Sequence, residues 1–250
     1  MRRFDAKTAL LTGAASGVGR AVAIRLAAEG ADVYAVDIDE DGLEATATIV
    51  AESGGSVHVR PTDVRSVDEC RRAVDDCVAA FGRLDVLGNI AGVSWQRHVA
   101  DIDEAAWDAI FAVNVKGPFF LCQAALPHLL EAGGNIVNIA SNAATMGMAY
   151  TAPYCATKGA VVAMTRALAM EFAKTELRVN AIAPGGIDTP LVHRFEIPAD
   201  ADLDLIRPGI GFRGMARPED VAALFAFVAS DEATNLHGSV IAADSGLTAG

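Results

Sequence analysis

The stretch "TGAASGVG", from Thr12 to Gly19, decides how this chain folds. It follows a short β-rich run at 8–13 and leads directly into a helical pattern at 17–29. Its glycines at 13, 17 and 19 allow the backbone to turn tightly and to approach a pyrophosphate, which the N-terminus of the following helix attracts. Their spacing is G-x-x-x-G-x-G and not the commoner G-x-G-x-x-G. A glycine-rich turn between a strand and a helix predicts a dinucleotide-binding site.

Strand patterns alternate with helical patterns along most of the chain. The strand patterns are nearly continuous apolar runs, which are typical of parallel strands covered on both faces. We expect strands at 8–13, 31–37, 56–63, 84–92, 134–141, 177–185 and 238–244, and helices that include 17–29 and 66–81. The second helix opens with a predicted capping box between Ser66 and Glu69. We therefore predict an α/β fold: a single-domain, Rossmann-type doubly wound parallel sheet over residues 1–250, with helices on both faces.

The segment 188–218 interrupts this alternation. It is rich in proline and glycine and contains no clear strand pattern. A long irregular insertion in a compact domain is usually functional or disordered. Because it follows the end of an expected strand, where open α/β sheets bind ligands, we interpret it as a substrate lid.

Composition limits the possible partners. The formal net charge of −12 argues against nucleic acid and anionic membrane surfaces as partners. No run of apolar residues approaches the length that we expect of a membrane span. The N-terminal residues, with Asp5 and Lys7 among them, do not resemble a signal peptide. We predict a cytoplasmic protein that binds neither nucleic acid nor membranes.

The four cysteines and five histidines show no metal-binding or disulfide pattern. Cys70 and Cys77 lie seven residues apart on an expected helix, about 10 Å along its axis, which is too far for a disulfide. There is no C-x-x-C or H-x-x-x-H spacing. We predict free cysteines, a reduced environment and no metal.

The end of the second expected strand indicates the cofactor. Asp37 lies eighteen residues beyond Gly19, where a carboxylate accepts hydrogen bonds from both ribose hydroxyls and repels a 2′-phosphate. No lysine or arginine stands in the glycine turn or directly after Asp37. We therefore expect NAD(H) in preference to NADP(H).

Further motifs follow in a fixed order along the chain. "DV" occupies 63–64, "NIAG" occupies 89–92, "YCATK" occupies 154–158 and "PGGIDTP" occupies 184–190. Together with the glycine turn, these motifs resemble those of the short-chain dehydrogenase/reductase family, in its group with chains of this length. The departures are Ile90, where the family has a second asparagine, and "DSG" at 244–246, where many members have D-G-G. We expect small effects from both.

The resemblance implies a site composition. Its catalytic residues would be Asn114, Ser141, Tyr154 and Lys158, with Ser141 holding the substrate oxygen and Asn114 supporting a water chain that relays protons from Lys158. The residues that would bind the cofactor are Gly13, Ser16, Gly17, Val18, Gly19, Asp37, Ile38, Asp63, Val64, Asn89, Ala91, Gly92, Tyr154, Lys158, Pro184, Gly185, Ile187 and Thr189.

The tyrosine and lysine of "YCATK" are four residues apart and share one face of an expected helix. A free tyrosine titrates near pH 10, too high for a base at neutral pH. Lowering that pKa by two to three units requires about 3–4 kcal/mol, which an ammonium about 4–5 Å away supplies at an effective dielectric of about 20. We therefore predict that Lys158 lowers the pKa of Tyr154, and the resemblance implies that it also holds the nicotinamide ribose.

The expected substrate wall is apolar. It comprises Val93, Trp95, Met146 and Met148, and it favours a medium-sized, mostly apolar secondary alcohol or ketone. A 3-oxoacyl-acyl-carrier-protein substrate is an alternative, although no lysine or arginine stands between Lys116 and Lys158 to dock an acidic carrier. A second alternative is a non-catalytic dinucleotide-binding regulator. Such proteins usually lose the tyrosine or the lysine, and this chain has both.

Two expected helices are apolar almost all round. They span 117–130 and 159–173, and the second carries only Arg166 and Glu171 as charges. A helix on one face of a sheet normally has a polar outer face. We therefore predict that these helices pack on symmetry mates, and the resemblance implies a homotetramer.

Overall fold

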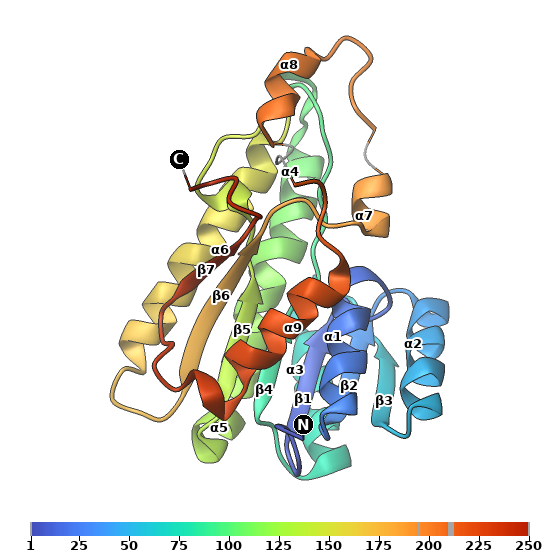
Figure 1. Cartoon of the computed structure of the whole chain (residues 1–250), viewed down its shortest axis with the longest axis vertical. Coiled ribbons are helices and arrows are strands. Elements are labelled where there is room, and N and C mark those ends of the chain that lie inside the picture. The colour runs from blue at the N-terminus through green and yellow to red at the C-terminus, as the bar shows by residue number, and fades with distance from the viewer. Residues whose placement is uncertain (1, 195, 210–212, 250) are drawn as a thin grey trace.

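The computed structural model describes residues 2–194, 196–209 and 213–249 (Figure 1). Its parallel sheet has the order β3-β2-β1-β4-β5-β6-β7. The strands are β1 (Thr8–Thr12), β2 (Asp32–Asp37), β3 (Ser56–Pro61), β4 (Val86–Asn89), β5 (Asn135–Ile139), β6 (Arg178–Pro184) and β7 (Val240–Ala243). All seven predicted strands are confirmed, with shorter ends. The strand order reverses between β1 and β4, which places a ligand-binding crevice at their carboxyl ends.

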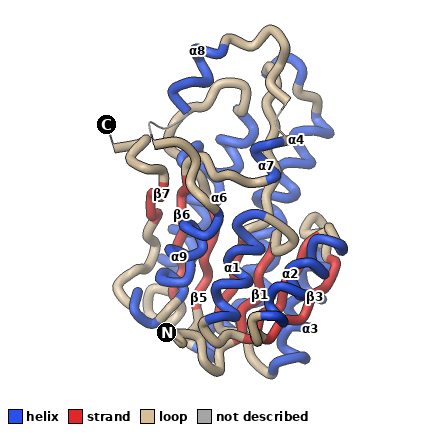
Figure 2. The backbone as a smooth tube through the Cα atoms, turned by 45° about the vertical axis from the view of Figure 1, so that its right-hand side comes forward, coloured by secondary structure: helices blue, strands red, loops and turns tan. Residues whose placement is uncertain are grey.

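Helices cover both faces of the sheet, as Figures 1 and 2 show. One face carries α1 (Gly17–Ala28), α2 (Glu40–Glu52) and α9 (Pro218–Ala229), and the other carries α3 (Val67–Phe81), α5 (Gly117–Ala132) and α6 (Ala152–Glu171). Successive side chains of a strand point to opposite faces. Accordingly, Leu11 of β1 packs in the core with Leu26 and Phe225, whereas its neighbour Leu10 packs in the second core with Leu87 and Leu121. Both cores therefore meet at β1, which ends at the glycine turn.

The predicted capping box of α3 is only half formed. The Ser66 hydroxyl accepts a hydrogen bond from the Glu69 amide at 3.3 Å, as expected. The Glu69 carboxylate, however, accepts from the amide of Asp63 at 2.7 Å and not from that of Ser66. The Ser66 amide donates to the Asp63 carbonyl instead. The reciprocal half is therefore replaced by a bond that holds the Asp63 loop against the helix.

A long helical run joins α4 (Glu104–Phe111), a π-helical turn (Ala112–Lys116) and α5. Within the described residues it is the one helix with the length and composition of a membrane span, so the prediction that no segment approaches that length was wrong. The error arose because α4 and α5 join through the π turn into one helix, Glu104–Ala132, which is longer than either part alone. Its apolar character has a local cause, since Leu121, Cys122 and Leu129 are buried in the second core.

The predicted lid lies beyond the carboxyl ends of the strands, at the top of Figure 1. It contains two short helices, α7 (Pro190–His193) and α8 (Leu203–Ile206), followed by a 3₁₀ turn at Arg207–Gly209. Ile187 and Ala216 form an isolated bridge at its base. Positions 195 and 210–212 of the predicted lid lie outside the described residues.

Candidate active site

The glycine turn is packed so tightly that side chains would not fit. A Cβ on Gly19 would lie 2.0 Å from the Gly13 carbonyl oxygen, and one on Gly13 would lie 2.9 Å from the Ala91 backbone. A Cβ on Gly17 would lie 3.1 Å from Cγ2 of Thr189. Gly13 and Gly17 also have positive φ angles of 69° and 51°. The turn therefore brings the predicted cofactor residues after β1, β4 and β6 together in one place.

The N-terminus of α1 suits an anion. Its N-cap residue, Ser16, has an extended backbone, and its side chain makes no capping hydrogen bond. The first turn holds no acidic residue. The amides of a first helical turn lack intrahelical partners and attract negative charge. Ser16, Gly17, Val18 and Gly19 therefore fit the diphosphate of a dinucleotide.

Asp37 is fixed against the glycine turn. One carboxylate oxygen accepts a hydrogen bond from the Ala15 amide and the other from the Asp39 amide, each at 3.1 Å. The neighbouring Ile38 is 69% exposed. The guanidinium of Arg20, directly after the glycine motif, donates to the carbonyls of Ala15 and Gly42. That arginine is therefore already engaged within the fold, while Asp37 retains free lone pairs for ribose hydroxyls.

Asn114 joins the segment after β4 to α6. It lies in the π turn, a feature that often marks functional sites. Its side-chain oxygen accepts from the Val93 amide and its nitrogen donates to the Val93 carbonyl, both at 2.9 Å. The same nitrogen donates to the Thr157 hydroxyl at 3.1 Å. Asn114 thus anchors the residue next to Lys158, and both its amide atoms are occupied.

Lys158 is buried at the centre of the site, with 5% of its surface exposed. Its Nζ donates to the Ile139 carbonyl at 2.8 Å and lies 5.7 Å from the centre of the Tyr154 ring. Burial lowers the pKa of this lysine to about 8. A Cβ on Gly92 would lie 3.5 Å from Nζ and 3.4 Å from the Asn114 side-chain oxygen, so these three predicted residues meet.

Tyr154 departs from the predicted protonation behaviour. Burial raises the pKa of its phenol above the ordinary value, and the Ser141 hydroxyl opposes that shift. The predicted lowering of the Tyr154 pKa is therefore wrong for this structure. Burial dominates, and the Ile139 carbonyl holds the lysine Nζ.

Ser141 immediately follows β5 and begins a 3₁₀ turn. Its hydroxyl accepts a hydrogen bond from the Ala143 amide and donates to the Asn142 side-chain oxygen, each at 3.1 Å. These bonds fix the rotamer of a side chain that is 7% exposed. The structure thus places Ser141 and Tyr154 together, from β5 and α6.

The remaining predicted cofactor residues border this centre. Arg65 binds the Asp63 carboxylate and holds its pKa below the usual value. Val64 packs so closely that a Cβ on Gly117 would lie 2.8 Å from its carbonyl oxygen. Asn89 is buried, and its amide nitrogen donates to Asn138 and Cys122. Pro184 ends β6, followed by Gly185, Ile187 and Thr189.

Thr12 is a structural residue of the site that the sequence reasoning did not single out. Its hydroxyl accepts hydrogen bonds from the amides of Ile90 and Ala91, at 2.9 and 3.0 Å. These bonds tie the end of β1 to the segment after β4. The bond to Ile90 uses its backbone amide and not its side chain, so an apolar side chain is accommodated at position 90. The position of Thr12 directly before the glycine turn is the signal that could have found it.

The described residues contain no group of three or more His, Cys, Asp or Glu side chains that could hold a metal. All four cysteines are free, as predicted. Cys70, Cys77 and Cys122 are buried, and burial raises the pKa of Cys70 to about 11 and those of the other two to about 12. These thiols therefore remain protonated at neutral pH and are unreactive.

Comparison with known proteins agrees with this geometry. A family model described as enoyl-(acyl carrier protein) reductase matches residues 13–248. A D-threitol dehydrogenase of Mycolicibacterium smegmatis is 38% identical, covering 98% of this chain and 94% of the relative. A 3-oxoacyl-acyl-carrier-protein reductase of Thermotoga maritima is 37% identical, covering 98% and 99%.

Solved structures with the same fold are also similar to this chain. A short-chain dehydrogenase from Mycobacterium paratuberculosis bound to NAD has a TM-score of 0.92 and 32% identity, covering 99% of this chain and 100% of that one. A short-chain dehydrogenase from Burkholderia cenocepacia in complex with NADP has a TM-score of 0.89 and 32% identity, covering 98% and 99%. The fold and site define a Rossmann-type oxidoreductase that binds a nicotinamide dinucleotide and acts on CH–OH groups. The chain belongs to the short-chain dehydrogenase/reductase family.

Proposed function

We propose that this protein is an NAD(H)-dependent oxidoreductase that interconverts a secondary alcohol and a ketone on a small molecule. The observation that carries this proposal is the meeting of Tyr154, Lys158, Asn114 and Ser141 at the carboxyl edge of the sheet, beside a glycine turn that fits a dinucleotide. A non-catalytic role would not require this combination of a buried lysine and a proton-bearing phenol.

The chain's own residues move the proton. When bound, a nicotinamide dinucleotide would accept hydride in oxidation and supply it in reduction. Tyr154 would take the hydroxyl proton in the first direction and donate a proton to the ketone oxygen in the second. The fixed hydroxyl of Ser141 would hold the substrate oxygen beside that phenol. Lys158 would carry positive charge below about pH 8 and so favour the phenolate when it forms.

Asn114 and Lys158 would have supporting roles. Because Asn114 fixes Thr157 and the Val93 backbone, it holds the two segments that flank Lys158. We propose that it also supports a water chain that relays protons from Lys158. The lysine would additionally hold the nicotinamide ribose.

The preference for NAD rests on Asp37. Its carboxylate is held against the glycine turn, and Arg20 is engaged by backbone carbonyls, so a 2′-phosphate would meet negative charge without a free cation. Similar solved structures include one bound to NAD and one in complex with NADP, so the proposed preference rests on Asp37.

A 3-oxoacyl thioester on an acyl carrier protein is the second candidate, because one relative is a reductase of that substrate. The chain's formal net charge of −12 opposes docking of an acidic carrier. We therefore propose a small-molecule substrate in preference to a carrier-bound one. We also propose that the enzyme is a cytoplasmic homotetramer.

A substrate screen tests the proposal. Purified protein is mixed with NAD and a panel of secondary alcohols, or with NADH and the matching ketones, and NADH absorbance is followed. We expect turnover with at least one matched pair. Turnover of none of them by a correctly folded protein, or turnover only of acyl-carrier-protein thioesters, would reject it.

A further inference from the structure

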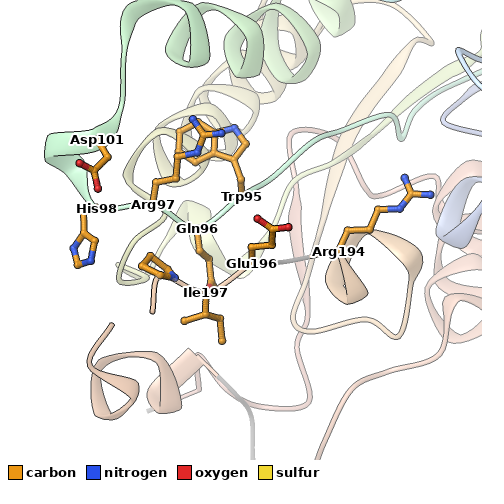
Figure 3. A pocket seen from close by; sticks show the side chains of 9 residues that line it. Trp95, Gln96, Arg97, His98, Asp101, Arg194, Glu196 and Ile197 are labelled. Atoms are coloured by element: carbon orange, nitrogen blue, oxygen red, sulfur yellow. The ribbon is translucent and has the colours of Figure 1, made fainter. Parts of the chain in front are cut away.

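An open pocket of about 450 Å³ lies between the segment after β4 and the lid (Figure 3). Trp95, Gln96 and Arg97 line it from the first side, and Arg194, Glu196 and Ile197 line it from the second. Of the four residues expected to form an apolar substrate wall, Trp95 is the one in this lining. This pocket is therefore distinct from most of the predicted apolar wall, and its lining is largely polar.

Hydrogen bonds connect this pocket to the reaction centre. On one side of Gln96, the backbone of Val93 is held by Asn114. On the other side, the amide of Arg97 donates to the Tyr150 carbonyl at 2.8 Å, four residues before Tyr154. Three extended residues span about 10 Å at most, so Gln96 lies within the length of a small molecule from Val93. Asn114 also bonds Thr157, next to Lys158, so the pocket adjoins the segments that surround the reaction centre.

The amide of Gln96 has no hydrogen-bond partner among the residues that the structure describes. Its side-chain oxygen is sealed from solvent and unpaired. A buried, unpaired polar atom costs free energy, so native proteins rarely retain one without a reason. Since the fold does not fix the amide, its oxygen and nitrogen can exchange places by rotation, so either atom can face the pocket while the other takes the sealed position. In Figure 3 the side chain extends toward the lid segment that carries Ile197.

The chemistry of the lining selects the ligand group. A hydroxyl both donates and accepts a hydrogen bond, so it satisfies the amide in either orientation, whereas a carboxylate satisfies the nitrogen alone. The pocket's charges also balance, because Arg97 and Arg194 are matched by Asp101 and Glu196. The guanidinium of Arg97 lies 5.0 Å from the centre of the Trp95 ring, which holds it at the pocket wall. Such a lining favours a neutral, hydroxylated molecule over an anion.

We propose that Gln96 determines substrate specificity by binding a second hydroxyl group, so that the preferred substrates are diols or polyols. This inference rests on the proposed function, because it describes the same alcohol oxidation. Gln96 touches the distant part of the substrate and takes no part in proton transfer. Oxidation occurs at the carbinol beside Tyr154, and the second hydroxyl is unchanged.

The test compares matched alcohols with wild-type protein and Gln96→Met. The substrate pairs are 2-butanol with 2,3-butanediol, 2-pentanol with 2,4-pentanediol, and 2-hexanol with 2,5-hexanediol. For at least one pair, we expect wild type to prefer the diol about tenfold in kcat/KM, mainly through KM, as one net hydrogen bond allows. In Gln96→Met that ratio should fall to near one.

Thermal unfolding without substrate supplies a second readout. Methionine has the length of glutamine but no unpaired oxygen, so the Tm of Gln96→Met should equal or exceed that of wild type. A purely structural glutamine would instead lose stability on this replacement. Gln96→Glu, which keeps oxygen acceptors at the same position, is the conservative variant and should retain part of the diol preference.

Three outcomes would overturn the inference. They are equal use of diols and mono-alcohols by wild type, an unchanged diol preference in Gln96→Met, and a preference for 3-hydroxybutanoate that Arg97→Met abolishes. The last would show that the pocket binds an anion. Turnover of no alcohol or ketone at all would reject the proposed function itself and is distinct from all three.

Discussion

Tyr154 is buried enough to keep its proton at neutral pH, since its pKa lies above the ordinary value. Tyr154→Phe removes the transferable proton and leaves the ring. We expect kcat to fall by about three orders of magnitude or more, the usual scale for loss of a general acid or base. NADH binding, followed by its fluorescence, should change little. A variant that retained more than a tenth of wild-type kcat would remove Tyr154 from that role.

The same pKa shift predicts the pH dependence of the reaction. A phenol whose pKa is raised remains an acid at neutral pH and becomes a base only at alkaline pH. Ketone reduction should therefore be fastest at neutral pH and decline as Tyr154 loses its proton, while alcohol oxidation should rise over the same alkaline range. Rates measured in both directions across pH 6 to about 10.5 check this. A reduction rate that rises with pH would contradict it.

The burial of Lys158 predicts how the stability of the fold depends on pH. Burial lowers its pKa in the folded protein to about 8, below its value of about 10.5 when unfolded. The folded state thus binds fewer protons between these pKa values, so stability decreases as pH falls from about 10.5 to about 8. Lys158→Met should raise the free energy of unfolding at pH 7, by about 3 kcal/mol at most. The difference from wild type should shrink toward pH 10, as denaturant unfolding would show.

The position of Asp37 predicts a preference for NAD over NADP. Its carboxylate is fixed by two backbone amides, so a 2′-phosphate cannot displace it easily. We expect kcat/KM with NAD to exceed that with NADP by at least about tenfold, or about 1.4 kcal/mol. Asp37→Ser, which removes the charge, should narrow the gap. Equal use of both cofactors by wild type would refute the assignment.

For individual residues, the sequence predicted which side chains of the site lie together but not their protonation states. The i to i+4 spacing placed Tyr154 and Lys158 on one face of a helix, and both lie in α6. Their pKa values depend instead on burial, and that of Tyr154 also on the Ser141 hydroxyl, thirteen residues before it. Such contacts exist only after the chain folds. The unpaired amide of Gln96 was unpredictable for the same reason.

The turn after β7 contains a strained residue. Ser245 has a φ of 57°, in the left-handed region that favours glycine. The neighbouring Asp244 fixes this conformation by accepting hydrogen bonds from the amides of Gly246 and Thr248, each at 3.0 Å. The small effect expected of "DSG" in place of D-G-G can therefore be expressed as a change in the free energy of unfolding caused by Ser245.

Ser245→Gly should stabilise the fold by about 1 kcal/mol, because glycine adopts the left-handed region without a steric penalty. Ser245→Ala is the control, since alanine keeps the penalty and should not stabilise. Denaturant unfolding at constant protein concentration measures both. If the two variants had equal stability, strain at this position would not be the cause.

Elements were predictable to different degrees. The seven strands followed from apolar runs because a parallel strand is buried on both faces over its whole length. The π turn at Ala112–Lys116 was not predicted, because it accompanies side-chain bonds from Asn114 to Val93 and Thr157. The α3 cap differed for a similar reason, as Glu69 turned to Asp63. Features that depend on a distant partner leave no local pattern.

The whole molecule leaves apolar surface on the outer sides of α5 and α6. Phe119 and Leu130 of α5 are 44% and 38% exposed, and Met170 of α6 is 76% exposed. Ala163 and Ala167 are also exposed, with Arg166 between them, so that side of α6 is poorer in polar residues than is normal for a solvated helix. β7 forms the edge of the sheet with one neighbouring strand. An exposed edge of this kind is usually covered in native proteins.

These two surfaces predict assembly of the chain with copies of itself. A two-fold axis beside α5 and α6 would bury the apolar side chains against their own counterparts, and a second contact at β7 would double the dimer. We expect a homotetramer, with light scattering behind a sizing column giving about four times the single-chain mass of 25.9 kDa. Phe119→Glu, which introduces a charge on the α5 surface, should lower that mass. A wild-type mass near 25.9 kDa at micromolar concentration would show the prediction to be wrong.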